Sequence, residues 1–381
     1  MRLAKLWLNA NTYLVSLVSL FVGLIVTFVA YQSIQIKETE AARLRFDRVM
    51  SDTARDIAGA MKGYERLLQA TRSYAHSVPE LKRENWHTFA EHLQLQERYP
   101  GLLGLGYAPF ITPSQLPEHV QAMRNEGFPA YDVSPLGERE AYTPITMLEP
   151  FSGRNVKAFG YDMYSEKVRR AAMDAARDAG SVALSGKVWL VQEGENPQLG
   201  ALMYLPIYLA DSIPLTVEER RSTLQGFVYS PFRMPDLMFA ALGERVGDMA
   251  LQLFDGDTAS DEALLYERRV EVLKGLPSYV PAFDETFQVE VGQRVWTLRL
   301  ATLPAFDVAT PAGRSLIILG AGVVLSFLLS GLLWSALTTQ ARAQALADRM
   351  TQAMKESEAN ARAVWTAPRR ESLSPTATLK W

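Results

Sequence analysis

The chain has 381 residues, with 39 Lys and Arg against 42 Asp and Glu, so its formal net charge is only −3. This near balance provides no overall basic field of the kind that nucleic-acid-binding proteins use. The absence of cysteine excludes disulfides, thiolate nucleophiles and every cysteine-liganded zinc or iron–sulfur site. A bacterial periplasm, where disulfides are optional, is compatible with this composition.

Two uncharged apolar segments, residues 13–31 and 315–337, enclose a polar region. Each is long enough to cross about 30 Å of hydrocarbon as a helix. Basic residues flank the same predicted side of both segments, although Arg314 lies on the other side: Arg2, Lys5, Arg342 and Arg349. We therefore expect a two-pass inner (plasma) membrane protein with both termini cytoplasmic, residues 1–12 at the N-terminus. A cleavable signal peptide is the alternative for the first segment.

After the first apolar segment, residues 32–79 predict one long helix, since the first proline is Pro79. A row of residues steps alternately by four and three, the 3.5 period of a coiled-coil seam. The row comprises Phe46, Met50, Thr53, Ile57, Ala60, Tyr64, Leu67, Thr71, Tyr74 and Val78. Two interpretations stay open: the helix packs on its own domain, or it forms the stalk of a homodimer.

Residues 80–230 alternate short apolar runs with helical patterns, which predicts an antiparallel sheet with helices on one side. We expect helices over 86–99, 113–127 and 165–180, and strands over 102–111, 131–134, 141–148, 182–192, 200–209 and 226–229. Ser165 is the expected N-cap of the third helix. Val168, Ala172, Ala175 and Ala179 are expected on one face of it.

A second, smaller unit is expected over residues 231–310. Its pattern predicts a helix over 234–242 and strands over 249–254, 263–266, 286–291 and 295–301. Gly292-Gln293 is suited to a tight hairpin between the last two strands. The last strand is followed by the second membrane segment after only about a dozen residues.

The C-terminal region is expected to be a signalling helix over residues 338–364 followed by an irregular tail over 365–381. Leu346, Met350, Ala353, Ser357 and Val364 form a heptad-like stripe in it. No kinase, cyclase or other effector domain fits in the tail. A natural end and a frameshift in the gene are both open explanations for it.

Several segments in order resemble the CHASE domain, the extracellular sensing module of cytokinin-type receptors and many bacterial receptors. The segments are residues 100–109 (PGLLGLGYAP), 142–145 (YTPI), Glu149-Pro150, 158–163 (AFGYDM), 169–173 (RRAAM), 183–185 (ALS), 202–208 (LMYLPIY) and 226–228 (GFV). The resemblance implies an α+β fold: a long stalk helix and two PAS-like α/β units, of which the membrane-distal one binds a small molecule. Full-length relatives carry a histidine kinase or a diguanylate cyclase, so we expect this sensory portion not to be an enzyme.

The resemblance also bears on the ligand. In the plant receptors an aspartate contacts the adenine of the hormone, and an ungapped count from Asp162 places Arg169 at that position. Tyr204 stands where those receptors have a pocket threonine. An adenine is therefore disfavoured, whereas Arg169 suits a carboxylate or phosphate, which a guanidinium binds bidentately.

The candidate ligand-binding residues follow from this resemblance and from the strand patterns: Phe159, Tyr161, Asp162, Met163, Arg169, Met173, Lys187, Leu190, Gln192, Tyr204 and Phe227. Core packing is the alternative for Phe159, Tyr161 and Met163, and solvent exposure for Lys187 and Gln192. The Tyr204 hydroxyl, if buried, needs a water or a ligand as its partner. Arg169 is either a pocket or a surface residue, and Arg170 is expected at the surface. Arg169→Ala is expected to abolish the ligand response with little loss of stability.

No catalytic constellation is evident. The four histidines, His76, His87, His92 and His119, do not have the spacing of a zinc protease. Asp255-Gly256-Asp257 lacks the ligand spacing of an EF-hand and is interpreted as a strand-to-strand turn. We expect a sensor of a small ligand with no cofactor, metal or nucleic-acid partner. The alternatives are a membrane-anchored protein-binding or scaffold module and an outer-facing hydrolase.

Overall fold

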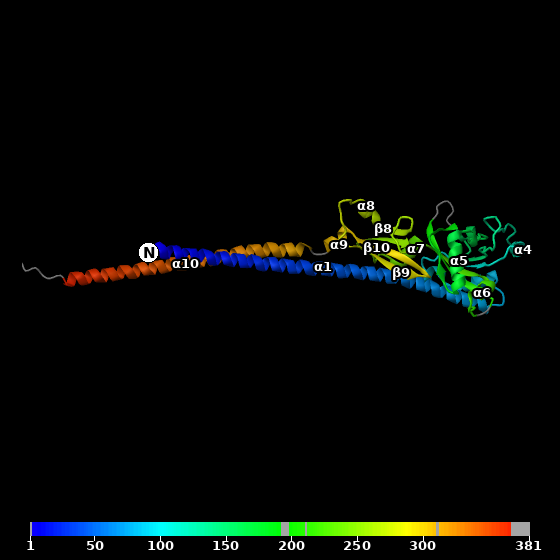
Figure 1. Cartoon of the computed structure of the whole chain (residues 1–381), viewed down its shortest axis with the longest axis horizontal. Coiled ribbons are helices and arrows are strands. Elements are labelled where there is room, and N and C mark those ends of the chain that lie inside the picture. Colours follow the sequence, from blue (N-terminus) through cyan, green and yellow to red (C-terminus); the bar gives the residue numbers. More distant parts are fainter. Residues whose placement is uncertain (1, 192–197, 210–211, 310–311, 367–381) are drawn as a thin grey trace, which may run out of the picture. The chain divides into compact units, whose positions relative to one another are not determined.

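The computed structural model describes residues 2–191, 198–209, 212–309 and 312–366. The chain forms two compact units, Met1–Glu40 with Pro311–Trp381, and Ala41–Thr310. The first is helical, and the second contains two antiparallel sheets with helices (Figure 1). The predicted α+β class with a long N-terminal helix is confirmed.

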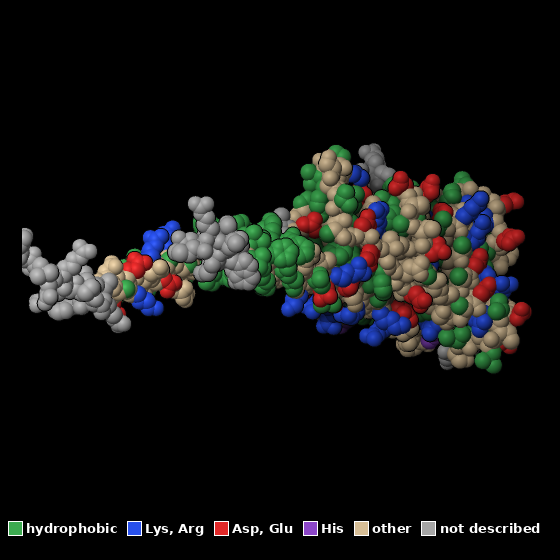
Figure 2. Space-filling model, turned by 60° about the vertical axis from the view of Figure 1, so that its left-hand side comes forward, with side chains coloured by type: hydrophobic (Ala, Val, Ile, Leu, Met, Phe, Trp, Pro, Cys, Tyr) green, Lys and Arg blue, Asp and Glu red, His purple; other side chains and the backbone are tan. Residues whose placement is uncertain are grey.

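Two long helices make up the helical unit: α10 (Ala312–Thr366) and the N-terminal part of α1 (Arg2–Ser77). Each has a window with a mean hydropathy of 2.5 and is long and apolar enough to cross a membrane. Most of their apolar side chains are exposed, and Figure 2 shows them as an apolar band. Small and hydroxyl residues mediate the contact of the two helices, for example Ser330 Oγ, which donates to Ser16 O at 2.8 Å.

The first sheet of the larger unit has the strand order β2-β1-β6-β5-β3, and β4 also pairs with β5. Its strands are β1 (Leu105–Pro109), β2 (Met147–Glu149), β3 (Ala183–Leu184), β4 (Val188–Trp189), β5 (Leu199–Tyr208) and β6 (Leu224–Arg233). The helices around it are α2 (Arg83–Leu93), α3 (Leu95–Arg98), α4 (Leu116–Asn125), η1 (Asn155–Ala158), η2 (Met163–Ser165), α5 (Lys167–Ala179) and α6 (Val217–Ser222). We call this part the first lobe.

The second sheet, with order β8-β7-β10-β9, forms the second lobe. Its elements are α7 (Met234–Leu242), β7 (Met249–Asp255), β8 (Leu264–Arg268), α8 (Val270–Lys274), β9 (Asp284–Val291), β10 (Arg294–Thr302) and α9 (Pro304–Ala309). Gly292 and Gln293 join β9 to β10 with φ of 49° and 63°, the left-handed pair of a tight hairpin turn. Helix α7 has the predicted bounds, and the hairpin is where the sequence predicts it.

The C-terminal part of α1 packs against both sheets and shares one apolar core with them. The Phe46 ring stacks on Phe283 at 5.2 Å between centroids, and Tyr64 lies 5.1 Å from Phe232. Phe46, Met50, Thr53, Ile57, Tyr64, Leu67 and Thr71 of the predicted seam are all buried in this way. Over this stretch the seam packs on the chain's own domain, the first of the two interpretations.

Several predicted elements differ from the structure. The helix over 86–99 is interrupted at Gln94, which adopts a left-handed φ of 51°. Residues 131–134 form no strand and contribute one isolated bridge, Ser134 to Tyr161. The run 182–192 contains two strands of two residues each, because the chain leaves β5 between them to meet the second sheet. The strand propensity of the local sequence cannot predict where a chain leaves its neighbouring strand in this way.

Candidate ligand-binding site

The face of the first sheet that bears α5 carries a second apolar core, separate from the α1 side. Its larger buried members include residues of β5, β6, η2, α5 and the segment after β4: Met163, Met173, Leu190, Tyr204, Phe227 and Tyr229. Five of these were predicted ligand-binding residues. The structure therefore brings together residues that lie up to 66 positions apart in the sequence, from Met163 to Tyr229.

Helix α5 places Arg169 over this face. Its N-cap is Glu166, whose carboxylate accepts hydrogen bonds from the Val168 and Arg169 amides, and it ends at Gly180 in a left-handed conformation. The predicted cap, Ser165, instead donates its hydroxyl to Asp162 O at 2.6 Å. The buried face consists of Arg169, Ala172, Met173 and Ala176. The predicted face was wrong at Ala175 and Ala179, which are exposed. The helix is rotated about its axis relative to the prediction, so that Met173 and Ala176 face the core instead.

Arg169 is a buried cation with an incomplete set of partners. It is 3% exposed; Nη1 donates to Tyr161 Oη at 2.8 Å, and Nη2 donates to the Trp189 carbonyl at 2.7 Å. Its Nε is buried and has no hydrogen-bond partner among the described residues. Arg169 is therefore buried rather than at the surface, whereas the neighbouring Arg170 is exposed as predicted. A buried guanidinium with an unused donor favours an anion as its further partner.

Two buried tyrosines lie side by side on the sheet beneath this arginine. Tyr204 of β5 and Tyr229 of β6 are directly opposite in register, with ring centroids 6.2 Å apart. The Tyr204 hydroxyl reaches only the Met163 sulfur, at 3.6 Å, and the Tyr229 hydroxyl has no partner among the described residues. Burial raises the pKa of both phenols, so both remain neutral donors.

Gly106 of β1 makes room for the Tyr229 ring. It pairs with Tyr229 across the sheet, and a Cβ at this position would lie 2.4 Å from the ring. Only glycine leaves that space free. The sequence analysis missed Tyr229, although it stands two residues after Phe227 in a strand and therefore shares its face.

Asp162 is fully buried but has a structural role. One carboxylate oxygen, Oδ1, accepts hydrogen bonds from the Thr143 amide at 2.8 Å and the Tyr164 amide at 3.1 Å. The other, Oδ2, lies 3.3 Å from Arg139 Nη1. Burial raises the pKa of Asp162 against the opposing effect of these hydrogen bonds and of Arg139. It fixes the loop that leads into η2 and thereby positions Met163.

Two predicted residues lie away from this cluster. Phe159 packs in another cluster, where the Arg83 guanidinium lies 5.2 Å from its ring. Lys187 extends toward the second lobe, and its Nζ donates to Glu262 O at 2.8 Å. Gln192 lies outside the described residues. The Trp189 carbonyl, a contact of Arg169, was also missed, since no sequence signal marks a main-chain acceptor.

Residues 79–266 match the family model of the CHASE domain. The chain carries a CHASE domain. This sensory domain extends on both sides beyond the segments that carry the resemblance and includes the first sheet, α7 and strands β7 and β8.

Two further proteins resemble the chain. Hybrid signal transduction histidine kinase A of Dictyostelium discoideum is 30% identical over 141 residues, which is 35% of this chain and 6% of that protein. This chain thus corresponds to only a small part of that relative. An extracellular ligand binding receptor from Desulfohalobium retbaense matches with a TM-score of 0.42 and 11% identity, over 68% of this chain and 40% of the other.

Proposed function

We propose that the CHASE domain binds a small anionic molecule, with a carboxylate as the chemical group that is recognised, on the α5 face of the first sheet. The observation that carries this proposal is a group of three buried donors: Arg169 Nε and the Tyr229 hydroxyl have no partner among the described residues, and the Tyr204 hydroxyl donates only to a weak acceptor, the Met163 sulfur. Leaving such groups unpaired costs about 1–3 kcal/mol each. A carboxylate, with two acceptor oxygens, is suited to all three.

The surrounding side chains would select a small ligand. Met163, Met173 and Phe227 are fully buried around the donors, so the recognised group would be enclosed by apolar and thioether surface. Methionine side chains adapt readily, so this wall can re-pack around a ligand. Asp162 and Tyr161 would then be positioning residues, one for the loop and one for the guanidinium.

We further propose that the chain is a two-pass inner-membrane sensor with the CHASE domain outside and both termini in the cytoplasm. The two apolar helices and the basic residues next to them support this orientation. Ligand binding would shift a two-state arrangement of the lobes and, through β10, α9 and α10, of the membrane helices, in a homodimer. The output would come from a kinase or cyclase function, as the family resemblance implies.

A thermal-shift screen tests the ligand class. The full chain in lipid nanodiscs would be heated with small mono- and dicarboxylates, inorganic phosphate and the matched neutral amides. At a hundredfold excess over Kd, a carboxylate adds about 2.7 kcal/mol of stability. For a domain of this size that raises Tm by roughly 5 °C or more.

The controls use two adjacent arginines. The shift is expected to persist in Arg170→Ala, whose side chain is exposed, and to vanish in Arg169→Ala. No shift with any anion in a folded protein, or an equal shift with the amides, would contradict an anion site. The first of these results would favour a protein-binding module instead.

A further inference from the structure

A short segment connects the candidate site with the second lobe. Residues 181–189, here called the bridging segment, contain β3 and β4 and pair with β5 at both ends. At one end Ala183 is opposite Tyr204, and at the other the Trp189 carbonyl accepts the hydrogen bond from Arg169 Nη2. Two residues of the candidate site therefore contact this segment directly.

The same segment is hydrogen-bonded to the β9–β10 hairpin of the second lobe. The Leu184 amide donates to Gly292 O at 2.8 Å, and Gln293 Nε2 donates to Val182 O at 2.9 Å. Gln293 Nε2 also donates to Ser181 Oγ at 3.0 Å. The hairpin is thus anchored by main-chain contacts to residues that adjoin the site.

Asp255, at the end of β7, links the bridging segment to strand β10 of the second lobe. Its Oδ2 accepts the Lys187 amide at 3.1 Å, while its Oδ1 accepts Arg294 Nε at 2.9 Å and Nη2 at 2.7 Å. The Asp255 side chain is only 11% exposed, so the carboxylate is largely shielded from water, whereas the Arg294 side chain is 36% exposed. One carboxylate therefore holds both the bridging segment and the first residue of β10.

Helix α5 lies against the bridging segment next to Asp255. A Cβ at Gly186 would lie 2.9 Å from Asp255 Oδ2 and 3.0 Å from Val168 Cγ1, so the backbone there is confined between Asp255 and α5. Val168 precedes Arg169 in the chain. A displacement of Arg169 would consequently press on the bridging segment at two places, at Gly186 and at Trp189.

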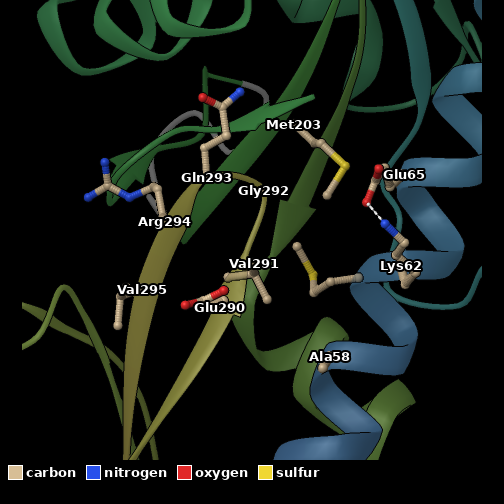
Figure 3. Close-up of a pocket in the computed structure, with 11 residues that line it drawn as sticks. Ala58, Lys62, Glu65, Met203, Glu290, Val291, Gly292, Gln293, Arg294 and Val295 are labelled. Atoms are coloured by element: carbon tan, nitrogen blue, oxygen red, sulfur yellow. Dashed lines mark hydrogen bonds and ion pairs between the residues drawn. The ribbon is translucent and has the colours of Figure 1, made fainter. Parts of the chain in front are cut away.

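On its other side the hairpin is less confined. Residues 290–295 line a cavity of about 430 Å³ together with Met203 and residues 58–65 of α1. Figure 3 shows the Lys62–Glu65 ion pair of α1 on one side of this cavity and Val291 and Gly292 of the hairpin on the other. The hairpin therefore has room to move relative to α1 while it stays bound to the bridging segment.

We propose that Asp255 is a positioning residue that couples the α5 site to the β9–β10 hairpin through the bridging segment. It holds the segment that presents the Trp189 carbonyl to Arg169, and it transmits a shift of that segment to β10. The role in sensing rests on the proposed function of the site. The coupling itself is a property of the ligand-free chain, so it can be tested without a ligand.

Hydrogen exchange of the full chain in nanodiscs, followed by mass spectrometry, provides the test. Asp255→Ala is expected to speed exchange at least tenfold in peptides that contain Lys187 and Leu184, with a smaller effect elsewhere. Asp257→Ala is the matched control, since Asp257 is exposed in the same turn and should change neither peptide. If Asp255→Ala does not fold, Asp255→Asn, which keeps the shape and one acceptor, replaces it.

The coupling is measured with a second change. Arg169→Lys replaces the guanidinium with a shorter side chain that loses the hydrogen bond to the Trp189 carbonyl. This change is expected to speed exchange severalfold both in the bridging segment and in residues 284–295. In the Asp255→Ala background the effect of Arg169→Lys on residues 284–295 should be clearly reduced, to the part that the Leu184 and Gln293 hydrogen bonds transmit, while the effect on the bridging segment remains. An Arg169→Lys effect that never reaches the hairpin, or that reaches it equally without Asp255, would overturn the proposal. Either result leaves the ligand screen unaffected.

Discussion

The two lobes of the domain use similar antiparallel sheets in different ways. Strands β5 and β6 of the first sheet are buried along nearly their whole length on both faces. Strand β9 of the second sheet alternates, with most residues exposed and only Val289 and Val291 buried. This contrast belongs to the edge of the second sheet, because its central strands β7 and β10 are also buried along most of their length. The two sheets therefore differ mainly in their edge strands and in the groups that they bury.

The polar atoms differ in the same sense. On the α5 face of the first sheet, Arg169 Nε and Tyr229 Oη are buried and unpaired among the described residues. In the second lobe, buried leucines, Val289 and Phe306 form an apolar core, with Trp296 Nε1 as its unpaired polar atom. Unpaired polar groups reduce stability, so the two on the α5 face support the binding role that we propose for it.

The largest expected effect belongs to the second lobe. Trp296→Ala removes a fully buried ring from the core and should lower the free energy of unfolding by about 3–5 kcal/mol. Denaturant unfolding of the full chain in nanodiscs measures it. Because the ring lies away from the α5 face, the ligand-induced rise in Tm should persist wherever the variant is folded. A lost shift in a folded variant would contradict the division of roles between the lobes.

A smaller loss is expected for Arg169→Ala, about 2–4 kcal/mol, because a buried side chain is removed and Tyr161 Oη and the Trp189 carbonyl both lose their donor. The sequence led us to expect little loss, on the assumption that this arginine was exposed or at a pocket rim. That assumption was wrong, because Arg169 is buried and only 3% exposed. Chemical denaturation of Arg169→Ala and of the control Arg170→Ala measures the difference in their free energies of unfolding. Equal stability of the two variants would refute this prediction.

Tyr229→Phe should separate stability from binding. Removing an unpaired buried hydroxyl is expected to leave stability unchanged or raise it by about 1 kcal/mol. Loss of one donor to the anion should at the same time weaken ligand binding about tenfold, the equivalent of roughly 1.4 kcal/mol. Thermal unfolding with and without the ligand reports both quantities. A clearly destabilised variant would mean that the hydroxyl has a structural partner.

The smallest effect concerns pH and the first lobe. His119 Nε2 lies 2.9 Å from Tyr131 Oη, and burial lowers the pKa of His119 to about 4. The unfolded chain therefore binds more protons between the ordinary pKa of 6.5 and 4, so stability should fall as the pH drops through this range. His119→Gln should make the Tm of the protein less dependent on pH there. An unchanged slope would exclude His119 as the cause.

Parts of this architecture could be predicted from local sequence. The Gly292-Gln293 turn has both residues at positive φ, which is the requirement that the dipeptide signals. The bounds of α7 follow from its continuous apolar run. The grouping of Met163, Met173, Tyr204 and Phe227 came from the family resemblance, because their meeting on one face depends on strand pairing between distant segments.

Other parts depend on tertiary contacts that no local pattern reports. Glu166 rather than Ser165 caps α5 because the Ser165 hydroxyl is bound to Asp162 O. Lys187 points to the second lobe because the bridging segment leaves the sheet to meet Asp255. The burial of Arg169 depends on the position of the strand that bears Trp189, whose carbonyl accepts its hydrogen bond.

The account is tested most directly by isothermal titration calorimetry of the most stabilising carboxylate against three forms of the full chain in nanodiscs: wild type, Arg169→Lys and Arg170→Lys. We expect Arg170→Lys to bind as wild type does and Arg169→Lys to bind at least tenfold more weakly, since lysine cannot reproduce the bidentate fork. Equal affinity in all three forms would place the ligand elsewhere and contradict the account.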